Sequence, residues 1–113
     1  MPRIRLERGP VICERGVLAL SAWSRTKGLL GRSSLDDDEG LWIQPTSSIH
    51  MWFMRIPLDV VWTSADGRVL KLTENIKPWR IAFCHGAKVA LELPVGAIAR
   101  SGVQVGDHVV IEQ

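Results

Sequence analysis

Hydrophobic and polar residues alternate along much of the chain, and this alternation predicts short β-strands. Residues Arg3 to Glu7 alternate in this way, and Lys88 to Leu93 do so again before Pro94 ends the run. A period of two places one set of side chains on the core face of a sheet and the other set toward solvent. Shorter apolar runs predict further strands at residues 11–13, 17–20, 41–43, 58–62, 68–72 and 108–111.

Turn-forming residues separate these strands. Glu14-Arg15-Gly16 lies between two apolar runs and predicts a hairpin. Asp66-Gly67 is a stronger signal, because this dipeptide is typical of two-residue hairpin turns. With about eight to nine short strands, the predicted fold class is mainly β, a compact antiparallel barrel or sandwich. There is no repeat or linker, so residues 1–113 are expected to form a single domain.

Two segments depart from the strand pattern. Ser24 can cap a short helix near residues 24–32, which would press Leu29 and Leu30 against the sheet. Gly28 and Gly31 weaken this helix, so only two or three turns are expected. A helical turn is also predicted near residues 95–100, after Pro94 and before a glycine.

Composition narrows the class of protein. The chain is 46% hydrophobic and 23% charged, as ordinary globular proteins are. Its net charge of +2 comes from scattered basic residues, which argues against a nucleic-acid partner. No apolar run is long enough to span a membrane, and no signal peptide is recognisable. We therefore expect a cytoplasmic protein with no membrane partner, in which Cys13 and Cys84 are reduced thiols.

The stretch from Ile49 to Trp62 carries the most unusual side chains. In an extended segment, alternation places Ile49, Met51 and Phe53 on one face and His50, Trp52 and Met54 on the other. The first face is uniformly apolar and suits the core. The second is then expected to line a cleft that binds a ligand, or else to pack under a neighbouring loop.

Two carboxylates interrupt apolar strands. Asp59 and Glu92 each need a cation or backbone N–H groups as partner, because an unpaired buried charge is costly. Arg25, Lys27 and Arg80 are the candidate cations. Two interpretations remain open: a pair of acid–base groups, or structural members of ion pairs, which is the commoner case.

Metal and nucleophile chemistry has less support. The soft ligands His50, Met51, Met54, Cys84 and His85 diverge along their strands, so neither a metal nor another cofactor is predicted. The acidic run of residues 36–40 lacks the alternate ligands of a calcium loop. A nucleophile formed by Cys84 and His50 is possible in space, but no spacing favours it.

Several motifs in a fixed order resemble the family known as domain of unknown function 192. They are Lys27-Gly28-Leu29-Leu30-Gly31-Arg32, Glu39 to Ile43, Ile49 to Met54, Pro57 to Val61, Pro78-Trp79-Arg80, Val89 to Gly96 and Gly106-Asp107. The resemblance implies a small β-barrel or sandwich with a short helix, and it implies no activity. Matches to the recurrent pattern of the family are Arg25, Gly28, Leu29, His50, Met54, Asp59, Glu92, Gly96 and Asp107. Met51 and Trp52 stand where many members carry Thr and Phe.

The leading hypothesis is a non-catalytic ligand-binding β domain that recognises a small molecule or peptide in a cleft lined by residues 50–62. Its expected binding residues are His50, Trp52, Met54, Asp59, Arg80 and Glu92. One alternative is a small hydrolase or lyase that uses His50 with Asp59 or Glu92 as acid and base. Another is a protein–protein interaction module that forms a homodimer.

Overall fold

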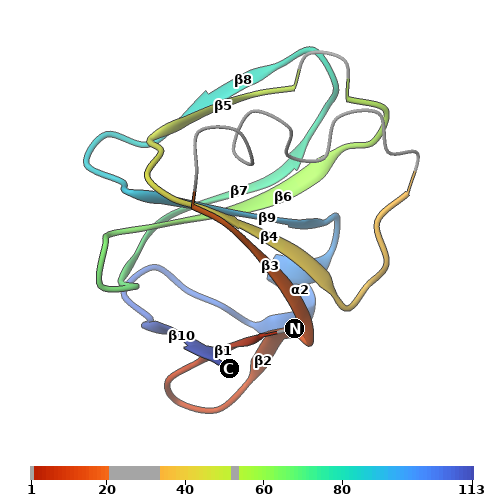
Figure 1. Ribbon diagram of the computed structural model, residues 1–113. Coiled ribbons are helices and arrows are strands. Elements are labelled where there is room, and N and C mark those ends of the chain that lie inside the picture. The colour runs from red at the N-terminus through yellow and green to blue at the C-terminus, as the bar shows by residue number, and fades with distance from the viewer. Residues whose placement is uncertain (1, 21–33, 52–53) are drawn as a thin grey trace.

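The computed structural model describes residues 2–20, 34–51 and 54–113. These residues form ten strands and one short helix (Figure 1). In chain order they are β1 Arg3–Leu6, β2 Val11–Cys13, β3 Arg15–Ala19, β4 Glu39–Ile43, β5 Ser48–His50, β6 Leu58–Thr63, β7 Val69–Ile76, β8 Ile81–Phe83, β9 Val89–Pro94, α2 Ala97–Ser101 and β10 Val109–Glu112.

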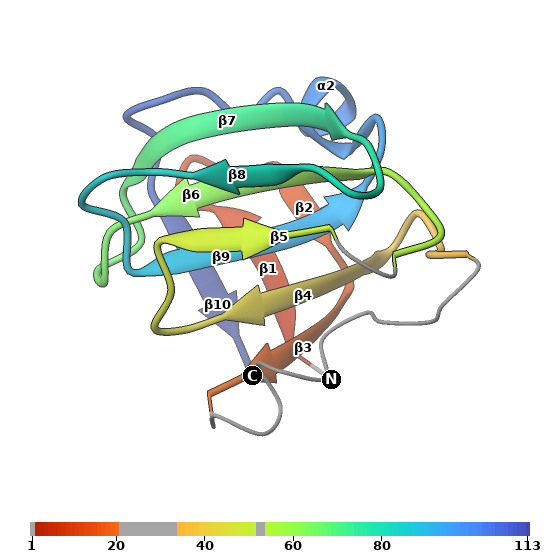
Figure 2. The same ribbon diagram turned by 90° about the horizontal axis from the view of Figure 1, so that it is seen from above.

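A five-stranded central sheet in the order β3-β4-β9-β6-β7 organises the molecule. A three-stranded sheet, β10-β1-β2, lies on one side of it together with α2 (Figure 1). The two-stranded ribbon β5-β8 lies on the other side, as both views show (Figure 2). Both faces of the central sheet are therefore covered, and all six residues of β6 and all six of β9 are buried.

Two apolar cores follow from this layering. The first core lies between the central sheet, the three-stranded sheet and α2, and it includes Trp42, Val61 and Leu91. The second core lies between the central sheet and the β5–β8 ribbon, and it includes Met51 and Trp62. Neighbouring residues along β6 and β9 point into different cores because side chains alternate along a strand.

The predicted fold class is confirmed: the protein is mainly β and sandwich-like, and its described strands form no closed barrel. The helical turn predicted near 95–100 is α2. The Asp66-Gly67 turn joins β6 to β7, as predicted. Gly67 has a positive φ of 94°, and a Cβ there would collide with the carbonyl oxygen of Val109. Only glycine fits where this hairpin meets the end of the three-stranded sheet.

The predicted hairpin around residues 14–16 is wrong. β2 pairs with β1, whereas β3 runs parallel to β4 from Arg15 opposite Glu39 onward. Arg15 anchors this parallel pairing, since its guanidinium contacts Asp36 and Asp38 at 3.0 and 2.8 Å. The two strands therefore enter different sheets.

Two other expectations have different outcomes. The strand predicted at residues 68–72 extends to Ile76 as β7, and the following strand β8 was not predicted. The helix expected near residues 24–32 lies outside the described residues. In the part of the chain that is described, no helix is long and apolar enough to cross a membrane.

Candidate functional site

Glu92 is the most unusual side chain of the second core. It lies on β9 opposite Leu41 of β4 and Val60 of β6, and cross-strand partners project to the same face of a sheet. Leu41 and Val60 both belong to the second core. The Glu92 carboxyl therefore stands among aliphatic side chains, and the residue is only 7% exposed.

The electrostatic environment of Glu92 disfavours a negative charge. Within the described ranges, no hydrogen-bond donor and no cation contacts its carboxyl group. Burial raises the pKa of Glu92 from 4.5 to about 7 because removal from water destabilises the charged form. The protonated form of Glu92 therefore persists to a higher pH than that of a solvent-exposed glutamate, and this form can donate a hydrogen bond.

Asp59 is also buried, but its carboxylate is fully partnered. It accepts hydrogen bonds from the backbone N–H groups of Asn75 at 2.9 Å, Gly96 at 3.0 Å and Ile98 at 3.1 Å. The last two lie at the start of α2, where a carboxylate satisfies N–H groups that the helix leaves unpaired. Asp59 thus holds α2 against the central sheet. The sequence predicted either a cation or backbone N–H groups as the partner of Asp59, and the partners in the structure are backbone N–H groups.

The two carboxylates lie on opposite faces of the central sheet. Val60 is the cross-strand partner of Glu92, and Asp59 immediately precedes Val60 on β6. Because adjacent residues on a strand point to opposite faces, Asp59 faces α2 while Glu92 faces the ribbon. The structure therefore does not bring them together as an acid–base pair.

The segment after β5 does not keep the predicted alternation. Ile49 and Met51 are buried and His50 is exposed, as alternation requires. Met54, however, is 7% exposed and packs in the second core, so the prediction that it shares the exposed face of His50 is wrong. The strand ends at His50, and the backbone N–H of Met54 bonds to the carbonyl oxygen of Met51 at 3.3 Å, so the chain turns.

Two other predicted binding residues, His50 and Arg80, lie at the surface, whereas Glu92 is buried. Arg80 is exposed just before β8, and its carbonyl oxygen accepts a hydrogen bond from Met51 N–H at 2.7 Å. His50 is exposed on the ribbon, whereas Glu92 faces the core beneath it. Trp52 and the two candidate cations Arg25 and Lys27 lie outside the described residues.

The cysteines occupy separate cores. Cys13 belongs to the first core and Cys84 to the second, and both thiols are free. Burial raises the pKa of Cys13 to about 11, which leaves it an unreactive thiol at neutral pH. No cluster of His, Cys, Asp and Glu among the described side chains could hold a metal ion.

Sequence reasoning missed an exposed apolar ridge on the ribbon. Ile81 and Phe83 alternate on β8 and are each 64% exposed, and Trp79 in the turn just before the strand is 60% exposed. The pattern Trp-x-Ile-x-Phe was visible in the sequence. An apolar alternation normally marks a buried face, and only the structure places this one on the outside.

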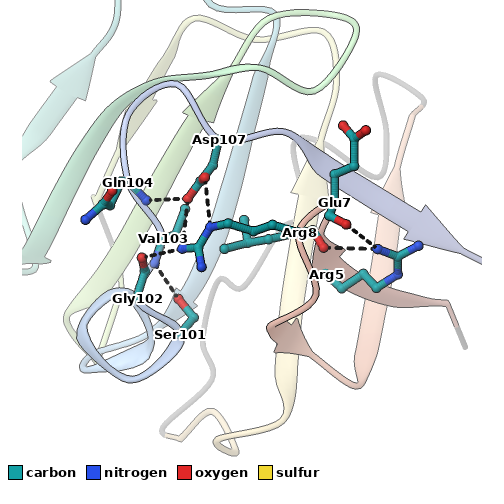
Figure 3. A network of polar contacts seen from close by, with 9 residues as sticks. Arg5, Glu7, Arg8, Ser101, Gly102, Val103, Gln104 and Asp107 are labelled. Atoms are coloured by element: carbon teal, nitrogen blue, oxygen red, sulfur yellow. Dashed lines mark hydrogen bonds and ion pairs between the residues drawn. The ribbon is translucent and has the colours of Figure 1, made fainter.

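A polar network lies at the opposite side of the molecule, where the β1–β2 turn meets the chain before β10 (Figure 3). The Arg8 guanidinium bonds to both carboxylate oxygens of Asp107, at 3.0 and 3.2 Å, and to the Gly102 carbonyl at 2.9 Å. Asp107 also accepts a hydrogen bond from the Gln104 N–H at 2.8 Å. Arg8 and Asp107, which both line the shallow depression beside this network, are therefore already paired with each other.

Asp107→Asn is expected to lower the melting temperature at neutral pH by a few degrees, because the variant loses a two-point ion pair. Arg8 holds the pKa of Asp107 below its usual 3.8, so this stabilisation is present above pH 3.8 and disappears as pH falls through the lower folded-state pKa. Melting curves of parent and variant at neutral and acidic pH measure it. A difference that persists after Asp107 is protonated would contradict the ion-pair assignment.

Fold and site together define a small β-sandwich protein in which the buried Glu92 carboxyl faces the second core and has no hydrogen-bond or ion-pair partner among the described residues. The sequence model of domain of unknown function 192, described as "Uncharacterized ACR, COG1430", matches residues 14–111. The chain belongs to this family.

Relatives and solved structures agree with this assignment. The chain is 36% identical over 64 residues to a UPF0127 protein of Thermococcus sibiricus, which covers 56% of this chain and 41% of that protein. It is 38% identical over 63 residues to one of Pyrococcus furiosus, with 55% and 53% covered. The chain thus spans about half the length, or less, of these curated relatives.

Two solved structures share the fold. A protein of unknown function from Novosphingobium aromaticivorans superposes with a TM-score of 0.82 at 29% identity, covering 96% of this chain and 82% of that one. A protein from Sinorhizobium meliloti, named as a proposed transcription regulator, gives a TM-score of 0.80 at 28% identity, with 97% and 92% covered.

Proposed function

We propose that this chain is a non-catalytic β domain that binds a small ligand on the Glu92 face of the central sheet. The observation that carries the proposal is the Glu92 carboxyl, which is buried among apolar side chains with no partner in the described part of the chain. Ionising a buried carboxyl without a partner is costly, and a carboxyl with a strongly raised pKa in such a position is a candidate functional group. A ligand that supplies the missing partner would remove the cost.

The surroundings of Glu92 restrict the ligand. Leu41 and Val60 flank the carboxyl, and Met51 and Met54 belong to the same core. An apolar body with one amine or guanidinium group matches this environment, because its apolar part replaces water and its nitrogen pairs with the carboxylate. Methionine side chains adapt readily to ligands of differing shape.

A panel of small probes tests the proposal. Phenethylamine and phenylguanidine are expected to bind the parent protein in titration calorimetry, whereas phenylacetate, which carries the opposite charge, is not. Binding is expected to strengthen as pH rises through about 7, where Glu92 ionises. Glu92→Gln is expected to weaken amine binding at least tenfold because the charge-assisted hydrogen bond is lost.

Glu74→Gln is the matched control, since Glu74 is an exposed carboxylate on β7 at the edge of the same sheet. This variant is expected to bind the amines as the parent does. Equal affinity of the parent and Glu92→Gln, or binding of phenylacetate as tight as that of phenethylamine, would refute the assignment.

A further inference from the structure

The β5–β8 ribbon presents an exposed apolar ridge, formed by Trp79, Ile81 and Phe83. Each is at least 60% exposed. Among the described residues, the other exposed large apolar side chains are aliphatic and belong to other elements: Val11, Val17, Leu20, Val95 and Val105. The ridge therefore concentrates the exposed aromatic surface of the described chain on β8 and the turn that precedes it. A concentration of this kind marks an interaction surface.

The exposed charged residues of the ribbon and its connecting segments are basic. Residues 40–58 and 75–91, which include both strands of the ribbon, contain no Asp or Glu. Their exposed cations are Arg55, Lys77, Arg80 and Lys88. The exposed acidic residue directly beside these ranges is Glu74 on β7. The Lys71 ammonium on the neighbouring β7 lies 5.5 Å from the centroid of the Phe83 ring and donates to the Phe83 carbonyl at 2.8 Å.

The ribbon lies at one extreme of the molecule, on the side of the central sheet away from both termini (Figure 1). Ile81 and Phe83 of β8 are each 64% exposed at this end of the molecule. We infer that the ridge docks on an anionic lipid surface, with Trp79, Ile81 and Phe83 at the boundary between headgroups and acyl chains. The surrounding lysines and arginines would contact lipid phosphates.

Charge complementarity and the chemistry of the ridge favour lipid over other anionic partners. A cationic surface beside aromatic and aliphatic side chains matches an anionic headgroup layer that overlies hydrocarbon. Nucleic acid would stack bases on Trp79 and Phe83, but Ile81 between them offers neither a stacking plane nor a hydrogen bond. In a bilayer the same isoleucine contributes apolar burial.

Flotation of the protein with vesicles tests the inference. The parent is expected to bind vesicles of phosphatidylcholine mixed with phosphatidylglycerol at least tenfold more tightly than vesicles of phosphatidylcholine alone. Raising the salt from about 0.1 M to about 1 M shortens the screening length from about 10 Å to about 3 Å, so it is expected to release most of the protein. The double variant Ile81→Ser/Phe83→Ser is expected to bind the mixed vesicles at least tenfold less tightly.

Val105→Ser is the control, because Val105 is 62% exposed and lies outside the ribbon. It is expected to bind as the parent does, and melting curves establish that all variants are folded. Equal binding to both kinds of vesicle, or unchanged binding by the double variant, would overturn the inference. So would tighter binding to a single-stranded oligonucleotide than to lipid, or a dimer in light scattering that the double variant abolishes.

Discussion

Glu92→Gln is expected to raise the free energy of unfolding above neutral pH by about 3 kcal/mol relative to the parent protein. Burial raises the folded-state pKa of Glu92 from 4.5 to about 7. Ionisation is therefore more costly in the folded than in the unfolded chain. Glutamine carries no charge at any pH, so the variant escapes this cost.

The pH dependence has a definite sign. Below pH 4.5 Glu92 is protonated in the folded and in the unfolded parent protein. The stability that the protonated carboxyl contributes to the folded parent is then fully present. Between pH 4.5 and about 7 the unfolded chain ionises first, so this contribution is lost as pH rises. Above this range the difference between variant and parent becomes constant.

Urea unfolding of parent and variant at a series of pH values measures this difference. A difference in unfolding free energy that is the same at every pH would reflect the altered packing of the amide. A difference that changes with pH reports the titration of Glu92. Glu74→Gln, on the exposed surface of β7, is expected to show no such change between pH 4.5 and 7. A flat difference for Glu92→Gln would mean that a cation such as Arg25 or Lys27 keeps the carboxylate ionised, as the sequence also allowed.

Asp59→Asn is expected to destabilise the protein by about 3–5 kcal/mol. The carboxylate accepts three backbone hydrogen bonds at 1% exposure. Asparagine retains one acceptor oxygen, and its amide group turns donors toward N–H groups that are themselves donors. At least one N–H at the start of α2 would then be buried without a partner.

Urea unfolding and amide hydrogen exchange together test this expectation. The amides of Gly96 and Ile98 should exchange faster in the variant, because α2 loses its attachment to β6. Asp37→Asn is the control, since Asp37 is exposed, and its effect should stay within about 0.5 kcal/mol. Unchanged protection of these two amides would contradict the role assigned to Asp59.

The different roles of Asp59 and Glu92 explain how far the sequence could predict the site. Both residues interrupt apolar strands, so sequence reasoning identified both as buried groups that need partners. Nothing in the local pattern distinguishes them, because a shift of one residue in register exchanges the two faces of a strand. The pairing of β6 with β9 assigns one carboxylate to α2 and the other to the second core.

Other differences between the predictions and the structure also arise because strand lengths and strand pairings are not visible in the local sequence pattern. Met54 leaves the predicted face because β5 stops at His50, and a strand of three residues is too short for alternation to extend beyond it. The parallel pairing of β3 with β4 joins strands separated by residues 20–38, so no local turn signal announces it. The predicted roles of His50, Trp52 and Arg80 in binding remain predictions.

The sequence by itself determined the mainly β class, the Asp66-Gly67 hairpin, the helical turn after Pro94 and the family resemblance. These depend on side-chain period, turn chemistry and residues close together in the chain. Only the tertiary structure decided which face each side chain occupies, and that Trp79, Ile81 and Phe83 are exposed while Glu92 is buried. Burial depends on which layers cover a strand, and those layers are contributed by residues far apart in the sequence.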